Sequence, residues 1–385
     1  MPRVLIAGVS TRGFAESAAR AGYEVVAVDG YGDLDLVARA AVVRVARVRG
    51  GGRFSTRAAV AAARALECDA VVYEASFENH PRAVGALARA RPLWGNDPAA
   101  LARARDPRRL ARVATAAGLP VPRLRFAPPA AGAAWLVKPL RSGGGAGVVP
   151  WRRGARLPRG CYVQQRIAGV TGSIVFAADG RCAVPLGLSR ILAGERRFGA
   201  DGFRYCGNIL GAAGDPQFPD EARLLERAAR LAQAVTAAWG LVGVNGVDFV
   251  ARRGVPFAIE VNPRYTASME LVERAYGLSI FEIHARACAG TLPAFDLASA
   301  RRGAPGAVGK AILYARRRST MGEARAWLAD PDVRDVSPPG TRFAPRDPVC
   351  TVFARGADAA ACDAALERRA AALYRDIERS EARIA

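Results

Sequence analysis

A carboxylate lies inside an apolar, strand-like run in the second half of the chain. In NGVDFVARRGVPFAIEVNPR, residues 245–264, a short turn joins two segments with strong β-character. Asp248 and Glu260 lie near the ends of these segments, so antiparallel pairing is expected to bring both onto one face, which Asn262 shares. A hairpin whose charges merely face water is the alternative, but Glu260 interrupts the apolar sequence FAIEV. The pattern therefore favours a functional polar face on a β-hairpin.

The residue types on this face suit a metal-assisted reaction of phosphates. Two carboxylates and an amide oxygen are hard ligands fitted to Mg²⁺ that bridges phosphate oxygens. We therefore predict Asp248, Glu260 and Asn262 as metal ligands, with Mn²⁺ as a possible substitute. Arg264 follows directly and is available to stabilise the negative charge that develops on a transferred phosphoryl group.

A second signal is a lysine directly before a glycine-rich loop, in WLVKPLRSGGGAG at residues 135–147. Of the 56 lysine and arginine residues only Lys138 and Lys310 are lysines, which indicates a chemical requirement at this position. Glycines let successive backbone N–H groups point into one concavity that suits phosphate oxygens, and lysine adds a mobile point charge. A Walker A loop differs, because its lysine follows the glycines. A merely flexible hairpin is the alternative.

The first segment of the chain alternates apolar runs with alanine-rich stretches. The predicted strands span 4–10, 24–29 and 69–76, and the predicted helices span 14–23 and 81–90. This alternation is typical of a parallel α/β sheet, which binds ligands in the loops at the carboxyl ends of its strands. Those loops are residues 9–13, 29–35 and 76–80. The sequence GVSTRG lacks the GxGxxG spacing of a dinucleotide site, and Asp29 is at least as readily a turn cap as a ligand contact.

The composition excludes several classes of protein. With 385 residues and 51% apolar residues the chain can form two or three domains, and no apolar run approaches the ~18 residues of a membrane helix. The seven cysteines are scattered without a CxxC pair and there are two histidines, so we expect a reduced, cytoplasmic protein without a zinc cluster. A net charge of +21 can indicate nucleic-acid binding. Because the arginines are spread through alanine-rich helices, codon bias or an anionic substrate explains the charge, and nucleic acid is not expected as a partner.

The rest of the chain divides into helical and strand-rich segments. Residues 98–117 are predicted as a helical connector, 119–134 as a linker, 135–180 as strand-rich, and 221–239 and 278–290 as helices. The tail has predicted strands at 309–315 and 347–354 and a final helix from 359 to about 379. His284, on an apolar helix face, is interpreted as a core histidine, and no role is assigned to Lys310.

Together these residues resemble the ATP-grasp superfamily, in which two α+β lobes hold Mg·ATP between them. The resemblance covers nearly the whole chain and implies a fold of mixed class, α/β and α+β. Residues 1–96 would form a Rossmann-like pre-ATP-grasp domain, and residues 97–295 a two-lobed ATP-grasp fold with its small lobe at about 133–180. Residues 296–385 would form a small C-terminal α+β domain that completes the large lobe.

The resemblance also implies roles for individual residues. Lys138 would contact the α- and β-phosphates of ATP, and Arg264 matches the arginine of the ExNxR motif, so both are predicted to be catalytic. The carboxylates of Asp248 and Glu260, with Asn262, match the metal ligands. The phosphate loop would include Ser142, Gly143, Gly144, Gly145 and Gly147, and the adenine-binding hinge would include Gln164, Gln165, Arg166 and Ile167.

Departures from the family pattern narrow the function. Gln165 stands where many hinges carry glutamate, and residues 172–173 replace the expected acidic ribose contact. Biotin carboxylases carry a bicarbonate-activating glutamate four residues after the motif arginine, where this chain has Ser268, with Glu270 two residues beyond. Carboxylation of biotin is therefore not expected. The sequence most resembles carboligase-like ATP-grasp proteins that are distantly related to biotin carboxylase.

The predicted activity is ligation of a small-molecule carboxylate to an amine through an acyl phosphate, with release of ADP and phosphate. An ATP-grasp carboxylase or kinase-like enzyme and a non-catalytic nucleotide-binding regulator remain alternatives, and a homodimer is a possible assembly. For each residue predicted to contact substrate, the alternative is that it is a surface residue that faces solvent. These contacts are Arg190, Arg204, Tyr205 and Asn208 in a loop-rich insertion, and Glu78, Asn79 and His80 after a strand of the first domain.

Overall fold

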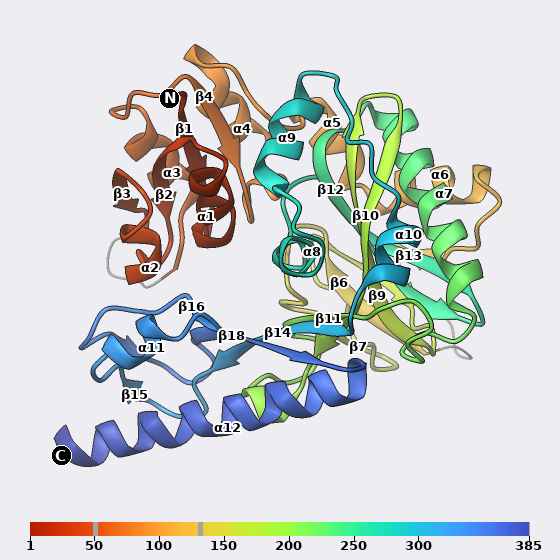
Figure 1. Cartoon of the computed structure of the whole chain (residues 1–385). Coiled ribbons are helices and arrows are strands. Elements are labelled where there is room, and N and C mark those ends of the chain that lie inside the picture. Colours follow the sequence, from red (N-terminus) through yellow and green to blue (C-terminus); the bar gives the residue numbers. More distant parts are fainter. Residues whose placement is uncertain (49–52, 130–133, 385) are drawn as a thin grey trace.

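The computed structural model describes residues 1–48, 53–129 and 134–384. The strands in this part of the chain form sheets of four, eight, two and four strands (Figure 1). Within the same residues no helix combines the length and the apolar character needed to cross a bilayer.

The first sheet is parallel, as the alternating sequence predicted. Its strand order is β3-β2-β1-β4. The strands are β1 (Arg3–Ala7), β2 (Glu24–Asp29), β3 (Val42–Val45) and β4 (Ala70–Tyr73), and the helices beside them are α1 (Arg12–Arg20), α2 (Leu34–Val37), α3 (Thr56–Ala63) and α4 (Pro81–Leu87), with 3₁₀ turns at Phe77–Asn79 and Ala88–Ala90. Strand β3 was not predicted from the sequence, because this edge strand is short and only partly buried.

Asp29, at the carboxyl end of β2, caps the turns at this edge of the sheet. Its carboxylate accepts hydrogen bonds from the backbone N–H (2.7 Å) and hydroxyl (2.9 Å) of Thr11. It also accepts from the N–H groups of Tyr31 and Gly32. The interpretation of Asp29 as a turn cap is therefore confirmed.

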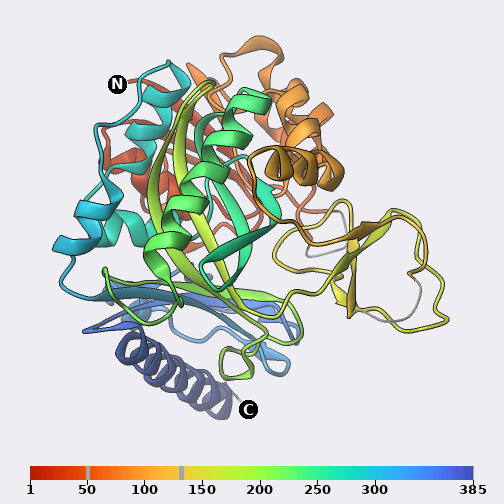
Figure 2. The ribbon, with the colours of Figure 1, turned by 90° about the vertical axis from the view of Figure 1, so that its right-hand side faces the viewer.

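A small antiparallel sheet projects from the rest of the molecule (Figure 2). Its strands, in the order β5-β8-β6-β7, are β5 (Leu124–Arg125), β6 (Trp135–Pro139), β7 (Val149–Pro150) and β8 (Cys161–Gln165). The predicted linker therefore contains an edge strand, β5, although its residues 130–133 lie outside the described part. The predicted connector is two helices, α5 (Pro98–Ala104) and α6 (Pro107–Ala116), because the Asp106 side chain caps a second helix that begins at Pro107.

The eight-stranded sheet runs in the order β13-β12-β9-β10-β11-β14-β18-β16. Its strands are β9 (Val170–Asp179), β10 (Ala183–Ala193), β11 (Tyr205–Leu210), β12 (Val242–Arg252), β13 (Val255–Asn262), β14 (Ala307–Tyr314), β16 (Val333–Arg334) and β18 (Pro348–Gly356).

Two predictions about the strands of this sheet were wrong. β9 was assigned to the small lobe but is an inner strand here, paired with β10 and β12. The insertion predicted as loop-rich contains β10 and β11, whose strand character was hidden because glycines such as Gly187 and Gly207 allow close packing inside the sheet.

Helices and short connecting elements complete the chain. The long helix α7 packs on the eight-stranded sheet, and the final helix α12 packs on β14 and β18 (Figure 1). The helices are α7 (Glu221–Trp239), α8 (Met269–Tyr276), α9 (Ile280–Cys288), α10 (Leu297–Gly303), α11 (Arg325–Ala329) and α12 (Ala359–Ile384), with a 3₁₀ turn at Arg196–Phe198 and a two-stranded ribbon of β15 (Ser319–Thr320) and β17 (Arg342–Phe343).

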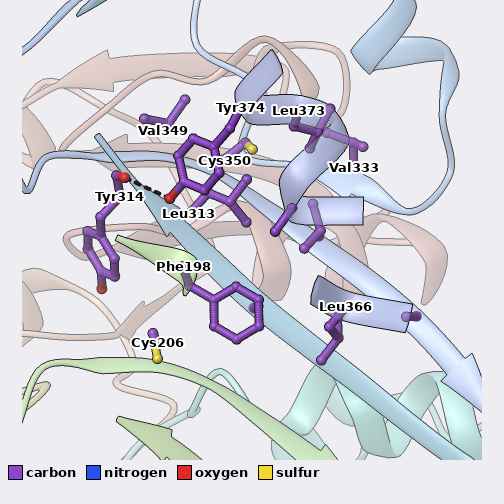
Figure 3. Packing of buried hydrophobic residues seen from close by; sticks show 14 of the residues in the cluster. Phe198, Cys206, Leu313, Tyr314, Val333, Val349, Cys350, Leu366, Leu373 and Tyr374 are labelled. Carbon is purple, nitrogen blue, oxygen red and sulfur yellow. Dashed lines mark hydrogen bonds between the residues drawn. The ribbon is translucent and has the colours of Figure 1, made fainter. Parts of the chain in front are cut away.

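An apolar core fixes the C-terminal strands under the site described below (Figure 3). Phe198, Leu313 and Leu366 are fully buried in it. The Tyr374 hydroxyl of α12 donates to the carbonyl of Tyr314 at 2.9 Å, and the Tyr314 hydroxyl donates to the carbonyl of Tyr205 at 2.8 Å. This chain of hydrogen bonds ties α12 to β14 and β14 to β11.

His284 is a buried core histidine, as predicted. Its Nδ1 accepts a hydrogen bond from the N–H of Val244 in β12 at 3.0 Å, and its Nε2 lies 3.1 Å from the carbonyl oxygen of Trp94. Burial lowers the pKa of His284 to about 4, and the hydrogen bond with Trp94 opposes this shift only in part. The neutral histidine therefore holds the beginning of β12 in place.

We predict that this histidine makes stability depend on pH. Because the folded-state pKa of His284 is depressed, its contribution to the free energy of unfolding is present above the ordinary pKa near 6.5. This contribution is lost as pH falls toward 4. The loss between pH 7 and pH 5 should be about 2 kcal/mol. Urea unfolding at both pH values should show a smaller loss in His284→Gln than in wild type. The exposed His80→Gln should behave as wild type, and equal losses in all three proteins would contradict the prediction.

Candidate active site

One cavity of about 1150 Å³ collects most of the residues that sequence analysis singled out. Its walls come from the first sheet, the small sheet and the eight-stranded sheet. The predicted residues that line it are Lys138, Ser142, Gly143, Gly144, Gly145, Gly147, Gln164, Gln165, Arg166, Ile167, Arg204, Tyr205, Asn208, Asp248, Glu260, Asn262 and Arg264. Lys310 lines it too, so both lysines of the chain meet at one cavity.

The β12–β13 hairpin brings the two carboxylates together, as predicted. Asp248 lies directly opposite Glu260 in the register, and a bulge follows Asp248. The Asn262 side-chain amide donates to Asp248 Oδ2 at 2.9 Å. The three predicted metal ligands therefore share one surface of the cavity.

The two carboxylates, Asp248 and Glu260, have pKa values shifted in opposite directions. Burial, together with the charge of Glu260, raises the pKa of Asp248 to about 6. Burial would also raise the pKa of Glu260, but the positive charges of Arg105 and Lys138 outweigh it and lower that pKa. Glu260 is therefore held as a carboxylate, whereas Asp248 lacks a full compensating charge.

Lys138, on β6, reaches across to the hairpin. Its Nζ donates to Gln164 Oε1 at 3.1 Å and to the carbonyl of Ile259 at 3.3 Å. Burial lowers its pKa, and the nearby Glu260 opposes that effect. A lysine at this point connects the small sheet to β13 across the cavity.

Arg105 is a site residue that sequence analysis missed. It caps the end of α5 and pairs with Glu260, and it donates to Asn79 Oδ1 at 3.1 Å and to the carbonyl of Ser142 at 2.8 Å. The sequence gives little signal for it, because it lies among the many arginines of residues 98–117. Arg105 therefore connects Glu260 of the carboxylate pair, Ser142 of the glycine loop and Asn79 beside the first sheet.

The glycine loop lies against the segment before β11. The carbonyl of Gly144 accepts from the N–H of Tyr205 at 3.0 Å. A Cβ added to Gly145, whose φ is +74°, would lie 1.8 Å from the carbonyl oxygen of Phe203. Only glycine fits this approach, so the loop is shaped by its contact with Phe203 and not only by a requirement for flexibility.

Arg264 is held by a residue of the first sheet. Its Nη2 donates to Glu78 Oε1 at 2.9 Å, and Glu78 is 1% exposed. Glu78 and Asn79 thus lie behind the cavity wall, where they position Arg264 and Arg105. The prediction that they contact substrate directly is not supported by this placement.

Arg190 also lies away from the cavity. Along β10 the neighbouring Ile191 lines the cavity, so strand alternation places Arg190 on the opposite face. There it lies 3.6 Å from Asp363 of α12. By contrast Tyr205 and Asn208 line the cavity, and the Tyr205 hydroxyl donates to Asn208 Oδ1 at 2.6 Å.

The predicted hinge has fewer free backbone donors than expected. The N–H of Gln165 donates to the carbonyl of Arg123, and the N–H of Arg166 donates to the carbonyl of Ala134, both at 2.8 Å. Within the described residues the N–H of Ile167 is left without a backbone acceptor. If the hinge binds adenine, Ile167 is the donor that remains for it.

A buried ion cluster forms another part of the wall. Arg12 donates to Glu270 and Asp335, and Lys310 also donates to Glu270. These ion pairs lower the pKa of Glu270 despite its burial. Arg12 and Asp335 were not singled out from the sequence, since they lie 323 residues apart and meet only in the fold.

The donor set fits a divalent cation that also binds phosphate. In the described residues no group of three His, Cys, Asp or Glu side chains could hold a metal ion. Two carboxylates and an amide alone are a sparse set for Mg²⁺, which commonly adds substrate phosphate oxygens and water. The incompletely compensated charge at Asp248 is consistent with such a cation.

We predict that Arg105 and Glu260 are energetically coupled. Arg105→Gln should lower the free energy of unfolding by about 2 kcal/mol, because a partly buried carboxylate loses its partner, and Arg105→Gln/Glu260→Gln should recover at least about 1 kcal/mol of that loss. Urea unfolding of the double-mutant cycle measures this. Arg109→Gln, with a half-exposed side chain, is the control and should change stability by less than about 0.5 kcal/mol. Additive effects at Arg105 and Glu260 would contradict the coupling.

Known proteins resemble both the sequence and the fold. Residues 104–268 match the family model of the ATP-grasp domain. The carbamoyl phosphate synthase large chain of Micrococcus luteus is 30% identical over 125 residues, which are 29% of this chain and 11% of that protein. The chain thus matches only about a tenth of the length of this relative.

Solved structures extend the likeness across the chain. The biotin carboxylase domain of the Hydrogenobacter thermophilus 2-oxoglutarate carboxylase, a dimer in complex with MgADP, ADP and bicarbonate, has a TM-score of 0.71 at 15% identity over 93% of this chain and 86% of that chain. The L-amino acid ligase of Bacillus licheniformis has a TM-score of 0.65 at 15% identity over 98% and 97%. At these identities the likeness shows the fold. Together with the family match over residues 104–268, this likeness confirms the resemblance to ATP-grasp proteins that the sequence predicted.

Proposed function

We propose that the protein is an ATP-dependent ligase that joins a small-molecule carboxylate to an amine. One observation carries the proposal: Lys138 and the Asp248–Glu260 pair face the same cavity, next to the glycine loop and Arg264. This is a set of charges for binding and neutralising phosphates. Positioning and charge neutralisation account for most of phosphoryl-transfer catalysis, so a protein nucleophile is not required.

Each part of the site has a proposed task in the first half-reaction. Lys138 binds phosphate oxygens, and residues 142–147 cover them with backbone N–H groups. Asp248, Glu260 and Asn262 would hold Mg²⁺, or Mn²⁺ in its place, which neutralises phosphate charge when bound. Arg264, held by Glu78, stabilises charge on the phosphoryl group as the substrate carboxylate oxygen attacks it and ADP leaves.

The second half-reaction uses the acyl phosphate. The amine nitrogen attacks the acyl carbon, phosphate leaves with the electrons of the broken C–O bond, and the nitrogen loses a proton. The contact of residues 203–205 with the glycine loop would exclude water from the reactive acyl phosphate. Tyr205, Asn208 and Arg204, which line the cavity nearby, are the proposed contacts for the carboxylate substrate.

The surroundings of Glu270 favour a ligase over a biotin-carboxylase-like reaction. Ser268 is buried, and its hydroxyl lies 3.1 Å from the hydroxyl of Thr266. Glu270 is buried and already paired with Arg12 and Lys310. Neither position therefore offers a free carboxylate to activate bicarbonate. The L-amino acid ligase, similar over nearly its whole length, supports C–N bond formation.

Assembly and location are also proposals. The biotin carboxylase domain of similar fold is a dimer, which supports a homodimer here, and sedimentation can measure this. All seven cysteines are free, in line with a reducing, cytoplasmic location.

We predict Mg²⁺-dependent ADP release that needs both a carboxylate and an amine. Purified protein is incubated with pooled carboxylates and pooled amines, singly and together. Lys138→Ala and Glu260→Ala should each reduce release by about 100-fold or more, because each removes charge that acts on the transferred phosphoryl group. Glu226→Ala, on an exposed face of α7, should retain wild-type release.

Other outcomes separate the alternatives. Release that needs only the acid would indicate a kinase-like enzyme, and release that needs bicarbonate would indicate a carboxylase. ATP binding without release in any pool would favour a regulator. Wild-type rates in both variants would refute the site assignment.

A further inference from the structure

The end of the cavity formed by the first sheet has an excess of acidic groups. It is built from the loops that follow β1, β2 and β4, where parallel sheets commonly bind ligands. Four carboxylates and two cations line it: Asp33, Glu74, Glu270 and Asp335, with Arg12 and Lys310. Arg264, which acts electrostatically on Glu74, also lines the cavity, so carboxylates outnumber cations here by one.

All but one of these carboxylates have a partner. Glu270 and Asp335 are paired with Arg12, and Asp33 accepts a hydrogen bond from the Ser337 hydroxyl at 3.3 Å. Glu74 is 5% exposed, and its Oε1 is buried without a hydrogen-bond partner among the described residues. Because a buried carboxylate without a partner costs several kcal/mol, such a residue indicates a missing ligand.

The fold holds Glu74 in this place. It directly follows β4, and its backbone N–H donates to the carbonyl of Ala7 at 2.8 Å. A Cβ added to Gly8 would lie 2.7 Å from the Cβ of Glu74, so glycine is needed for the two strands to approach. Burial raises the pKa of Glu74 well above its ordinary value, and Arg264 opposes this only in part. A positively charged group bound here would offset that cost.

We propose that Glu74 binds the ammonium group of the amine substrate. This inference rests on the proposed ligase function and assigns the amine to the first-sheet end of the cavity. Glu74 and Arg264 line the same cavity, so an amine bound at Glu74 would share that cavity with the phosphoryl group. The expected ligand class is a primary amine, such as an amino acid, that is positively charged in solution. Its ammonium group would pass one proton to the carboxylate of Glu74 before the nitrogen, then neutral, attacks the acyl carbon.

The test compares wild type with Glu74→Gln, which keeps the shape of the side chain but removes its charge. The probes are the pooled standard L-amino acids and, as neutral counterparts, the same compounds N-acetylated, each with Mg·ADP present. Wild type should show a rise in its unfolding midpoint with the free amines only. Glu74→Gln should need about tenfold or more higher amine concentrations, because a charge-assisted hydrogen bond is lost. Glu226→Gln is the matched surface control and should respond as wild type.

Three results would overturn the proposal. One is an equal response of wild type and Glu74→Gln, another is an equal response of wild type to free and acetylated probes, and the third is no response of wild type to the free amines. A separate measurement without ligand excludes a merely structural role. Without ligand, Glu74→Gln should unfold at or above the wild-type midpoint, because an uncompensated buried charge is removed, and a lower midpoint would count against the proposal.

A parallel assay separates this proposal from the ligase function. Hydroxylamine, which is largely uncharged at neutral pH, should trap the acyl phosphate as a hydroxamate when ATP and pooled carboxylates are supplied. Wild type should form hydroxamate. Absence of hydroxamate would refute the ligase function, whereas hydroxamate formation by wild type with equal amine responses of wild type and Glu74→Gln would refute only the role of Glu74.

Discussion

The pairing of β12 with β13 is the constraint on which the rest of the site depends. It sets Asp248 opposite Glu260, and two carboxylates in a partly buried position repel each other. That arrangement is tolerable only if cations approach from elsewhere. Lys138 comes from the small sheet and Arg105 from the end of α5, so the hairpin's charges hold separate parts of the chain around one cavity.

The two lysines have different surroundings, which explains why a chain rich in arginine keeps both. Lys138 contacts a side-chain amide and a carbonyl rather than a carboxylate, which supports its proposed role in binding phosphate oxygens. Lys310 is 3% exposed, donates to Glu270 and lies over the ring of Phe353. A compact ammonium fits this enclosed place between Glu270 and β18, where a planar guanidinium would need more donor partners.

Sequence patterns predicted the parts of the site that lie close together along the chain. The β12–β13 hairpin, Lys138 and the glycine loop could be found because their chemistry and their secondary structure share one short segment. Arg105 and Arg12 could not, because their roles depend on partners from distant segments, and Glu74 could not, because its burial without a hydrogen-bond partner is visible only in the fold. Arg190 shows the reverse error: its place in the sequence suggested a substrate contact, but strand alternation turns it toward α12.

The most direct test of the account is a crystal structure with Mn²⁺ and a non-hydrolysable ATP analogue. The anomalous signal of manganese would locate the metal ion. We expect manganese bound by Asp248, Glu260 and Asn262 together with phosphate oxygens, and the ammonium of Lys138 on the phosphates. The adenine should accept a hydrogen bond from the N–H of Ile167. Manganese or phosphates bound elsewhere, with the Asp248–Glu260 pair left without a cation, would contradict the central claim that this hairpin is built to bind metal-complexed ATP.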